Sequence, residues 1–266
     1  MSEKVLFLEI FQPFAQYRNP FTFYYAQTYP LPPKSTIIGM LQNAASKYYD
    51  EKLWQISVSI HGGFESTFWN YQQLIKGEVE NVEGVLYNQN LPLYGERLKA
   101  QRTPVYQQEL FNGHLYLFLK GQEELISEIK EYLDKPRKIL SLGRSEDLIF
   151  IKDIRVYEKE ETVTEKVEGD IRITFPTYIR KKDFPIKMSK YPVYSVPTKV
   201  VFKNNGIPVK NKFEITKSTE REVEFETVIY TGYEYSILLE ENKPLNVEFF
   251  EVGNKEIKII EDYGWL

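Results

Sequence analysis

The chain has 266 residues, 42% of them hydrophobic, and a formal net charge of −4 at pH 7. This length can bury a full core in one or two domains. The charge argues against a protein that binds polyanions over its whole surface, so nucleic-acid binding would need local basic patches. The lack of cysteine excludes disulfides and thiolate metal sites. Because no apolar run reaches the length of a membrane span, and residues 1–4 lead directly into a strand, we expect a cytoplasmic protein with no membrane partner.

The first part of the chain predicts a strand, a loop and a helix. Residues 5–11 are apolar and predict the strand, and residues 12–22 predict a loop that contains Tyr17 and Arg18. Residues 28–33 hold three prolines, which keep the chain extended because each fixes φ and moves its predecessor away from helix. Beyond Ser35, apolar residues recur at helical spacing, at Ile37, Leu41, Ala44 and Tyr48.

The start of this helix is a candidate phosphate site. Ser35 is the expected N-cap, because its hydroxyl can accept a hydrogen bond from an amide of the first turn. Lys34 and Thr36 lie beside the free amides, where an anion is favoured. The alternative is a well-capped helix that only covers a sheet. No glycine-rich turn precedes Lys34, so a nucleotide P-loop is excluded.

The next elements complete a β-α-β-β-α-β order. Residues 56–60 and 64–74 predict two strands joined across His61-Gly62-Gly63, and residues 77–101 have little regular pattern. Residues 103–110 and 114–119 flank Asn112-Gly113, a pair favoured in tight hairpin turns. Residues 122–133 predict a helix, and residues 147–157 a strand. The fold class is therefore α+β, with a ferredoxin-like frame of the kind found in RNA-recognition modules.

The acidic residues 158–170 predict a solvated connection near a domain boundary. Beyond them short strands dominate, at residues 171–175, 191–202, 223–230, 235–239 and 245–250. We therefore expect a ferredoxin-like domain over residues 1–157, with a hairpin insertion at about 92–120, and a smaller β-rich domain or extension over residues 171–266.

Two motifs carry a resemblance to a known family. Tyr-Pro-x-Pro-Pro-x-Ser-Thr-x-x-Gly runs from Tyr29 to Gly39, and Leu-Ser-Leu-Gly-Arg-Ser-Glu-Asp-Leu runs from residue 140 to 148. With the strand and arginine loop before them, they resemble CRISPR-associated protein family five, of the RAMP superfamily. The resemblance covers residues 1 to about 157.

The resemblance implies an antiviral function. It implies a non-catalytic subunit of a type I Cascade complex, of a I-B or I-A-like type, which binds the 5′ handle of the guide RNA (crRNA) and caps the backbone filament. The implied partners are crRNA, the Cascade backbone subunit, the large subunit and, indirectly, target DNA. No cofactor is implied.

Three basic clusters are candidates for phosphate contacts, which supply affinity without reading sequence. They are Arg18 with Lys34; Arg97, Lys99 and Arg102, followed by Tyr106; and residues 180–182 with Lys187 and Lys190. Each can instead be an ordinary solvated face. The second precedes the predicted hairpin, and in the resembled family an inserted thumb-like hairpin grips RNA, with Tyr106 here as a stacking candidate.

Gly143-Arg144-Ser145 forms a predicted loop between the second helix and the following strand. Glycine lets the backbone approach a ligand closely, and arginine can bind a phosphate with two hydrogen bonds. The alternative is a plain turn with a surface arginine. The resemblance favours RNA binding by these three residues, and by Tyr17 and Arg18.

Catalysis is the alternative function. The chain has only two histidines, His61 and His114, so a three-histidine metal site is excluded. One branch of the resembled family cuts precursor crRNA without metal, using a tyrosine and an adjacent Lys-His pair, but Ile60 and Gly113 precede the histidines here. His114 or His61, aided by Tyr17 or Lys120, remains a candidate acid or base. A plain scaffold protein with solvated basic clusters is a third possibility.

Overall fold

The computed structural model describes residues 3–22, 25–76, 101–158, 161–186, 191–232, 236–238 and 243–266, with the backbone alone at 73–76, 101–103 and 236–238. The helices among them are α1 (Lys34–Ala44), α2 (Glu123–Asp134) and the short 3-10 helices η1 (Glu51–Gln55) and η3 (Lys212–Glu214). The strands are β1 (Glu3–Ala15), β2 (Tyr25–Ala26), β3 (Ser57–Lys76), β4 (Gln101–Gln122), β5 (Phe150–Tyr157), β6 (Val163–Val167), β7 (Asp170–Arg172), β8 (Tyr178–Arg180), β9 (Val193–Asn204), β10 (Ile207–Pro208), β11 (Glu220–Tyr230), β12 (Ser236–Leu238), β13 (Leu245–Val252) and β14 (Lys255–Ile260).

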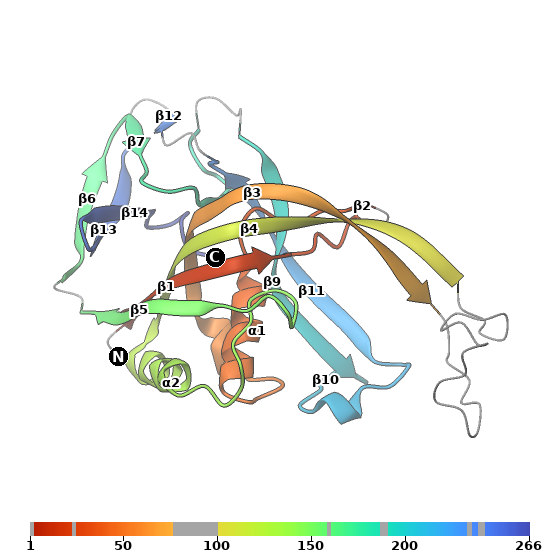
Figure 1. The fold of residues 1–266 in the computed structure, drawn as a ribbon. Helices are drawn as coiled ribbons and strands as arrows, with labels where there is room; N and C mark the ends of the chain where they lie inside the picture. The colour runs from red at the N-terminus through yellow and green to blue at the C-terminus, as the bar shows by residue number, and fades with distance from the viewer. Residues whose placement is uncertain are drawn as a thin grey trace, which may run out of the picture.

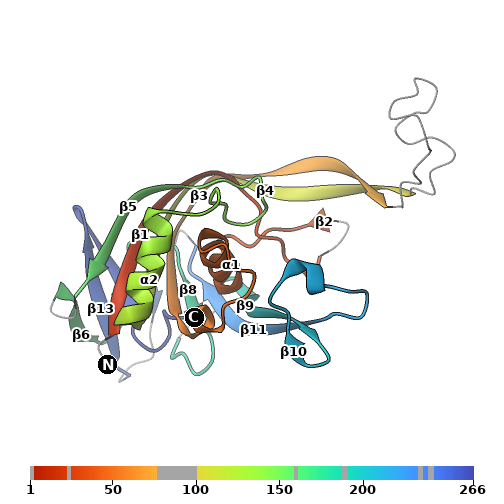
Figure 2. The ribbon, with the colours of Figure 1, turned by 90° about the horizontal axis from the view of Figure 1, so that it is seen from below.

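The largest sheet is antiparallel along the order β3-β4-β1-β5, and β2 adds a short parallel contact to β4. Helix α1 lies in the chain between β1 and β3, and α2 lies between β4 and β5. Figures 1 and 2 show both helices beneath the same face of the sheet. The predicted α+β class is thus confirmed: the described part is rich in sheet and has few helices. No helix of the described residues is long and apolar enough to cross a membrane.

Alternation along β1 supplies two buried faces, because neighbouring side chains of a strand point to opposite sides. One face of the sheet packs on the helices through Leu6, Leu8 and Ile10. The opposite face carries Phe7 and is covered by the hairpin β13–β14, whose side chains pack with it in one cluster of Val5, Phe7, Tyr116, Phe118, Tyr157, Phe250, Val252, Ile257, Ile259 and Trp265. The start of β1 is therefore closed to ligands on both sides.

Strands β3 and β4 form a long ladder that continues from Ser57 opposite Lys120 to Lys76 opposite Gln101. Its far end projects from the body of the molecule (Figures 1 and 2). The turns predicted at residues 61–63 and at Asn112-Gly113 are both wrong. Residues 61–63 lie inside the continuous strand β3, and Asn112-Gly113 lies inside β4.

Close packing between β3 and β4 explains why glycine stands at the two positions where turns were predicted. A Cβ at Gly62 would lie 2.1 Å from the carbonyl oxygen of His114, and a Cβ at Gly113 would lie 2.3 Å from the ring of Phe64. Asn112 has a φ of 55°, and its amide donates to Glu65 across the strands at 2.5 Å. The left-handed conformation therefore occurs within the ladder.

The remaining strands form three smaller sheets, ordered β10-β9-β11-β8, β12-β7 and β14-β13-β6. Strand β6 lies in the segment predicted as a solvated connection, so that prediction is wrong for residues 163–167. It pairs with β13, but its residues are mostly exposed, which is why their composition resembles a linker.

Side chains from both predicted domains share the main buried cluster. The Tyr178 hydroxyl donates to the Leu31 carbonyl oxygen at 2.9 Å, and the Tyr29 hydroxyl donates to that of Ser195 at 2.6 Å. These bonds hold the proline-rich approach to α1 against β8 and β9. The division into domains 1–157 and 171–266 stays a prediction.

Candidate nucleic-acid interface

Helix α1 begins two residues earlier than expected. Pro33 is the N-cap, in an extended conformation with φ −62° and ψ 155°, and no side chain caps the helix. The prediction that Ser35 is the N-cap is therefore wrong: proline's fixed φ suits the position, and Ser35 falls inside the first turn. The first intrahelical bonds run from the amides of Thr36 and Ile37 to the Pro33 carbonyl oxygen. The side chains of Ser35 and Thr36 are left half-buried beside a cavity.

A loop held by hydrogen bonds of its backbone amides carries Arg18, which lines the same cavity as this helix start. The Tyr17 amide donates to the Thr28 hydroxyl at 2.8 Å, and the Tyr29 amide donates to the Tyr17 carbonyl oxygen at 2.8 Å. Arg18 itself pairs with Thr28 in an antiparallel bridge. The exposed guanidinium thus rises from a loop whose two sides are joined.

Asp147 holds the second signature block against the end of β1. This carboxylate is 1% exposed and accepts hydrogen bonds from the amides of Gln16 at 3.0 Å and Arg144 at 2.9 Å. Gly143 is required at the contact, because its φ is +117° and a Cβ would lie 2.8 Å from the Asp147 carboxylate. A loop from residue 143 to 147 is thereby fixed beside the loop that carries Arg18.

The guanidinium of Arg144 is already paired. It lies 2.8 Å from Asp147 and 3.0 Å from Glu109 in ion pairs that are largely buried on the acidic side. Burial lowers the pKa of Arg144, but its bonds to Asp147 and then Glu109 outweigh this, so the pKa lies above its ordinary value. Since two carboxylates balance its charge, Arg144 forms part of the cavity wall but adds little net positive charge to it.

Tyr17 is buried beneath the same loops. Its hydroxyl donates to Gln12 Oε1 at 2.5 Å, and Gln12 Nε2 donates to the Leu142 carbonyl oxygen at 2.6 Å. Burial, with a smaller contribution from the charge of Asp147, raises the pKa of Tyr17 well above its ordinary value. The side chain is linked through Gln12 to the second signature block, and it is 2% exposed, so it offers no stacking face.

One cavity of about 250 Å³ unites the two signature blocks. The predicted residues that line it are Tyr17, Arg18, Ser35, Thr36, Gly143 and Arg144. Strand β11 adds Arg221, Val223 and Phe225, which the sequence analysis missed. Their period-two spacing indicates a shared strand face, but nothing local indicates which surface that face meets. We call this the arginine cavity; none of its lining residues is acidic.

Other predicted residues lie elsewhere. The Lys34 ammonium donates to the Leu266 carbonyl oxygen at 3.0 Å, and burial lowers its pKa to about 8. Ser145 is exposed and donates to Glu146. Arg97 and Lys99 lie outside the described residues, and Arg102 is described only by its backbone, opposite Ile75.

Tyr106 belongs to an exposed aromatic cluster formed by the projecting β3–β4 hairpin and the short strand β2. Its ring stacks on that of Tyr25 at 5.6 Å with planes 12° apart, and the Tyr71 ring meets it edge-on at 5.4 Å. Trp69 contacts Tyr25 edge-on at 6.3 Å. All four are 43–63% exposed. Tyr25, Trp69 and Tyr71 were missed, because only the cross-strand register brings them to Tyr106.

Sequence comparison identifies the family. The chain matches the family described as CRISPR-associated protein (Cas_Cas5) over residues 5–189. It belongs to the Cas5 family. A CRISPR-associated role follows, as the two motifs predicted. No curated protein matches the chain.

Several solved structures are similar to this Cas5 chain. One, titled a CRISPR RNA-guided surveillance complex, is 14% identical with a TM-score of 0.49, covering 91% of this chain and 92% of that chain. A CRISPR protein from Archaeoglobus fulgidus is 11% identical with a TM-score of 0.45, covering 96% and 98%. A chain of a Type III-B Cmr-beta complex is 15% identical with a TM-score of 0.34, covering 89% and 86%.

The two histidines of this Cas5 chain differ in surroundings. His61 is 1% exposed and bonds the Ser59 hydroxyl through Nε2 at 2.9 Å, and burial lowers its pKa to about 3. His114 is exposed and lines an open depression with Tyr116 and Lys255, whose ammonium lies 3.1 Å from the Tyr116 hydroxyl. Lys120 instead pairs with Glu248 at 2.8 Å. Among the described residues no group of histidine and acidic side chains could hold a metal ion.

Proposed function

We propose that this Cas5 chain is a non-catalytic subunit of a type I Cascade complex that binds the 5′ handle of crRNA. The observation that carries the proposal is the arginine cavity, in which two motifs distant in sequence meet with Arg18 and Arg221. Exposed guanidinium groups beside hydroxyls and first-turn amides suit the phosphates of an RNA backbone.

The strand order supports a ferredoxin-like frame for this binding. The elements β1, α1, β3, β4, α2 and β5 follow the chain order of that fold, and the antiparallel order β3-β4-β1-β5 is the one it requires. In an RNA-recognition module the sheet face opposite the helices stacks bases. Here β13 and β14 cover much of that face, so contacts at the loops and the projecting hairpin replace it.

The aromatic cluster of Tyr25, Trp69, Tyr71 and Tyr106 supports a second contact. Exposed rings stack on splayed bases at about 1–3 kcal/mol each, whatever the base. The hairpin that carries Trp69, Tyr71 and Tyr106 reaches away from the body and can follow a bent strand of RNA. The remaining proposed partners are the Cascade backbone subunit, the large subunit and, indirectly, target DNA, in a complex of the I-B or I-A-like type.

The test is RNA binding by a cavity variant. Labelled RNA of the repeat-derived 5′ handle is titrated with the full chain at several salt concentrations. For single strands, log affinity falls with log salt by about 0.7 per phosphate neutralised. The double change Arg18→Ala, Arg221→Ala should lower that slope by about 1.4, because two contacts are lost. The charge-matched control is Arg172→Ala with Lys166→Ala, both exposed and outside the cavity. Equal slopes in all three proteins would refute handle binding at this cavity.

Metal-free cleavage of precursor crRNA is the alternative function. The depression that joins His114 to Tyr116 and Lys255 favours it, since it combines a possible acid or base with a phenol and an ammonium group. We expect no cleavage of a full repeat RNA at neutral pH with chelator present. Specific cutting that His114→Ala abolishes would establish the ribonuclease instead.

A further inference from the structure

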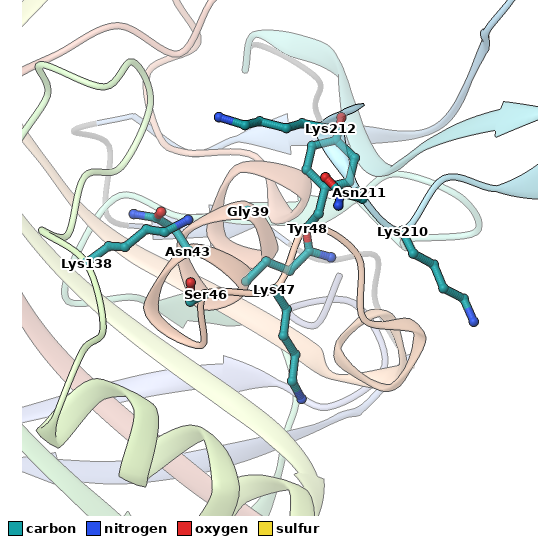
Figure 3. A pocket seen from close by; sticks show the side chains of 10 residues that line it. Gly39, Asn43, Ser46, Lys47, Tyr48, Lys138, Lys210, Asn211 and Lys212 are labelled. Atoms are coloured by element: carbon teal, nitrogen blue, oxygen red, sulfur yellow. The ribbon is translucent and has the colours of Figure 1, made fainter. Parts of the chain in front are cut away.

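A second basic cavity, of about 500 Å³, lies on the exposed side of α1. Three segments build it: α1 with the turn after it, the loop after α2, and the start of η3 (Figure 3). Its lysines are Lys47, Lys138, Lys210 and Lys212. We call it the lysine cavity, and none of its lining residues is acidic.

Three of these lysines carry the positive charge. The Lys47 ammonium is engaged by Asp50 at 2.7 Å and Glu128 at 3.3 Å. Lys138, Lys210 and Lys212 are exposed and form no ion pair among the described residues. The chain has a net charge of −4, so such a concentration of unpaired positive charge is a local feature of this face.

Gly39 lies in this cavity without a packing reason. It is the middle of α1, where glycine costs about 0.5–1 kcal/mol relative to alanine. A Cβ built there meets nothing within 4 Å, so no described protein atom requires its absence. Nearby, Gln42 lines the cavity, and its Nε2 atom is buried without a hydrogen-bond partner among the described residues. A bound molecule that approaches the helix backbone explains the missing side chain at Gly39.

We propose that the lysine cavity binds the phosphodiester backbone of a nucleic-acid strand, as a site additional to the arginine cavity. Its lining offers ammonium, amide and hydroxyl groups, the donors that contact phosphates. The cores of protein interfaces are instead depleted in lysine, which disfavours an acidic protein as the occupant.

The two cavities lie along one helix. Ser35 and Thr36 line the arginine cavity, and Gly39, Asn43 and Ser46 line the lysine cavity. At a rise of 1.5 Å per residue, the helical stretch from Ser35 to Asn43 spans roughly 12 Å. A strand leaving the arginine cavity can therefore continue over Gly39 to the lysines, and a separate DNA duplex can reach the same lysines from solvent.

The test compares the triple variant Lys138→Ala, Lys210→Ala, Lys212→Ala with the control Lys52→Ala, Lys130→Ala, Lys166→Ala, which removes equal charge elsewhere. Single-stranded repeat RNA and a short DNA duplex are the probes, each titrated against salt with the full chain. For the single strand the salt slope should fall by about 2, and affinity at moderate salt by on the order of tenfold. A loss confined to one probe identifies the source of the phosphates. Losses no larger than in the control, on both probes, would overturn the proposal.

Gly39→Phe tests the cavity without altering charge. A ring in open space should leave the fold intact while blocking the approach to the helix, so binding should weaken in this variant as in the lysine triple. The Arg18→Ala, Arg221→Ala double variant keeps the outcomes distinguishable. If it loses handle RNA while the lysine and Gly39 variants bind both probes normally, handle binding stands and the lysine cavity is not a nucleic-acid site.

Discussion

Individual residues of the arginine cavity hold the loops more than they offer free charge. Asp147 accepts hydrogen bonds from two loops, and Gly143 permits this contact. Arg144 forms ion pairs with Glu109 and Asp147. The glycine and arginine of the second signature are therefore required by the protein's own packing before any RNA is present. Arg18, Arg221 and the start of α1 line the same cavity.

The first prediction concerns Gly143. Its φ of +117° is strained for other residues, and the added Cβ would also lie 2.9 Å from the Gln16 carbonyl oxygen. Gly143→Ala should lower the free energy of unfolding by about 1–3 kcal/mol through backbone strain, and further through this overlap. Urea unfolding measures it. Gly169→Ala is the control, because its φ is +79° but nothing lies within 4 Å of the added Cβ. Equal losses of unfolding free energy in the two variants would mean that Asp147 and Gln16 move aside for the added Cβ at no cost.

At the scale of elements, sequence periodicity succeeded where one element makes its own pattern. The stripe of Leu125, Ile126, Ile129 and Leu133 predicted α2 to within one residue at each end. The turns predicted from local glycines were wrong, because Gly62 and Gly113 allow close packing between neighbouring strands and do not reverse the chain. Composition misled at β6, whose strand is defined by pairing with β13 rather than by its own burial.

The candidate site was predictable in its two motifs but not in its assembly. Arg18 and Gly143 carry signals in their own neighbourhoods. Arg221 and Trp69 do not, since a surface arginine or tryptophan acquires meaning only from what the fold brings beside it. The pairing of Arg144 could not be predicted either, because its partner Glu109 lies in β4, 35 residues earlier in the chain.

The hairpin supplies the prediction at this scale. The ring of Tyr106 is 43% exposed and stacks on Tyr25, so a base can extend the stack. Tyr106→Ala should weaken binding of the handle RNA by about 1–3 kcal/mol with little change in the salt slope, because stacking releases no counterions. Tyr106→Phe is the matched control: it keeps the π face and should bind normally. Equal weakening in both variants would assign the effect to the hydroxyl, and normal binding in both would exclude stacking here.

For the whole molecule, the hairpin β13–β14 determines which face of the largest sheet a ligand can reach. In the described structure, β13 and β14 close the face around Phe7, Phe118 and Tyr157. Residues 3–157 thus depend on the second half of the chain for one of their two buried faces. The RNA binding that we propose is therefore assigned to the arginine cavity, α1 and the hairpin, which lie outside this covered face.

This dependence predicts cooperative unfolding of the two predicted domains. Phe250 is fully buried, with its ring 4.8 Å from that of Phe118 and 5.3 Å from that of Tyr157. Phe250→Ala should lower the free energy of unfolding by about 3–5 kcal/mol, since it leaves a cavity between the halves. Urea unfolding followed by circular dichroism should stay a single transition at a lower midpoint. Amide hydrogen exchange in β4 should accelerate together with that in β13, because both lose the same packing. The control is Phe213→Ala, at a ring 82% exposed, which should change stability by no more than about 0.5 kcal/mol. If exchange accelerates in β13 alone and β4 keeps its protection, residues 3–157 fold without their cover, and the sheet face beneath it is available to RNA whenever β13 and β14 detach.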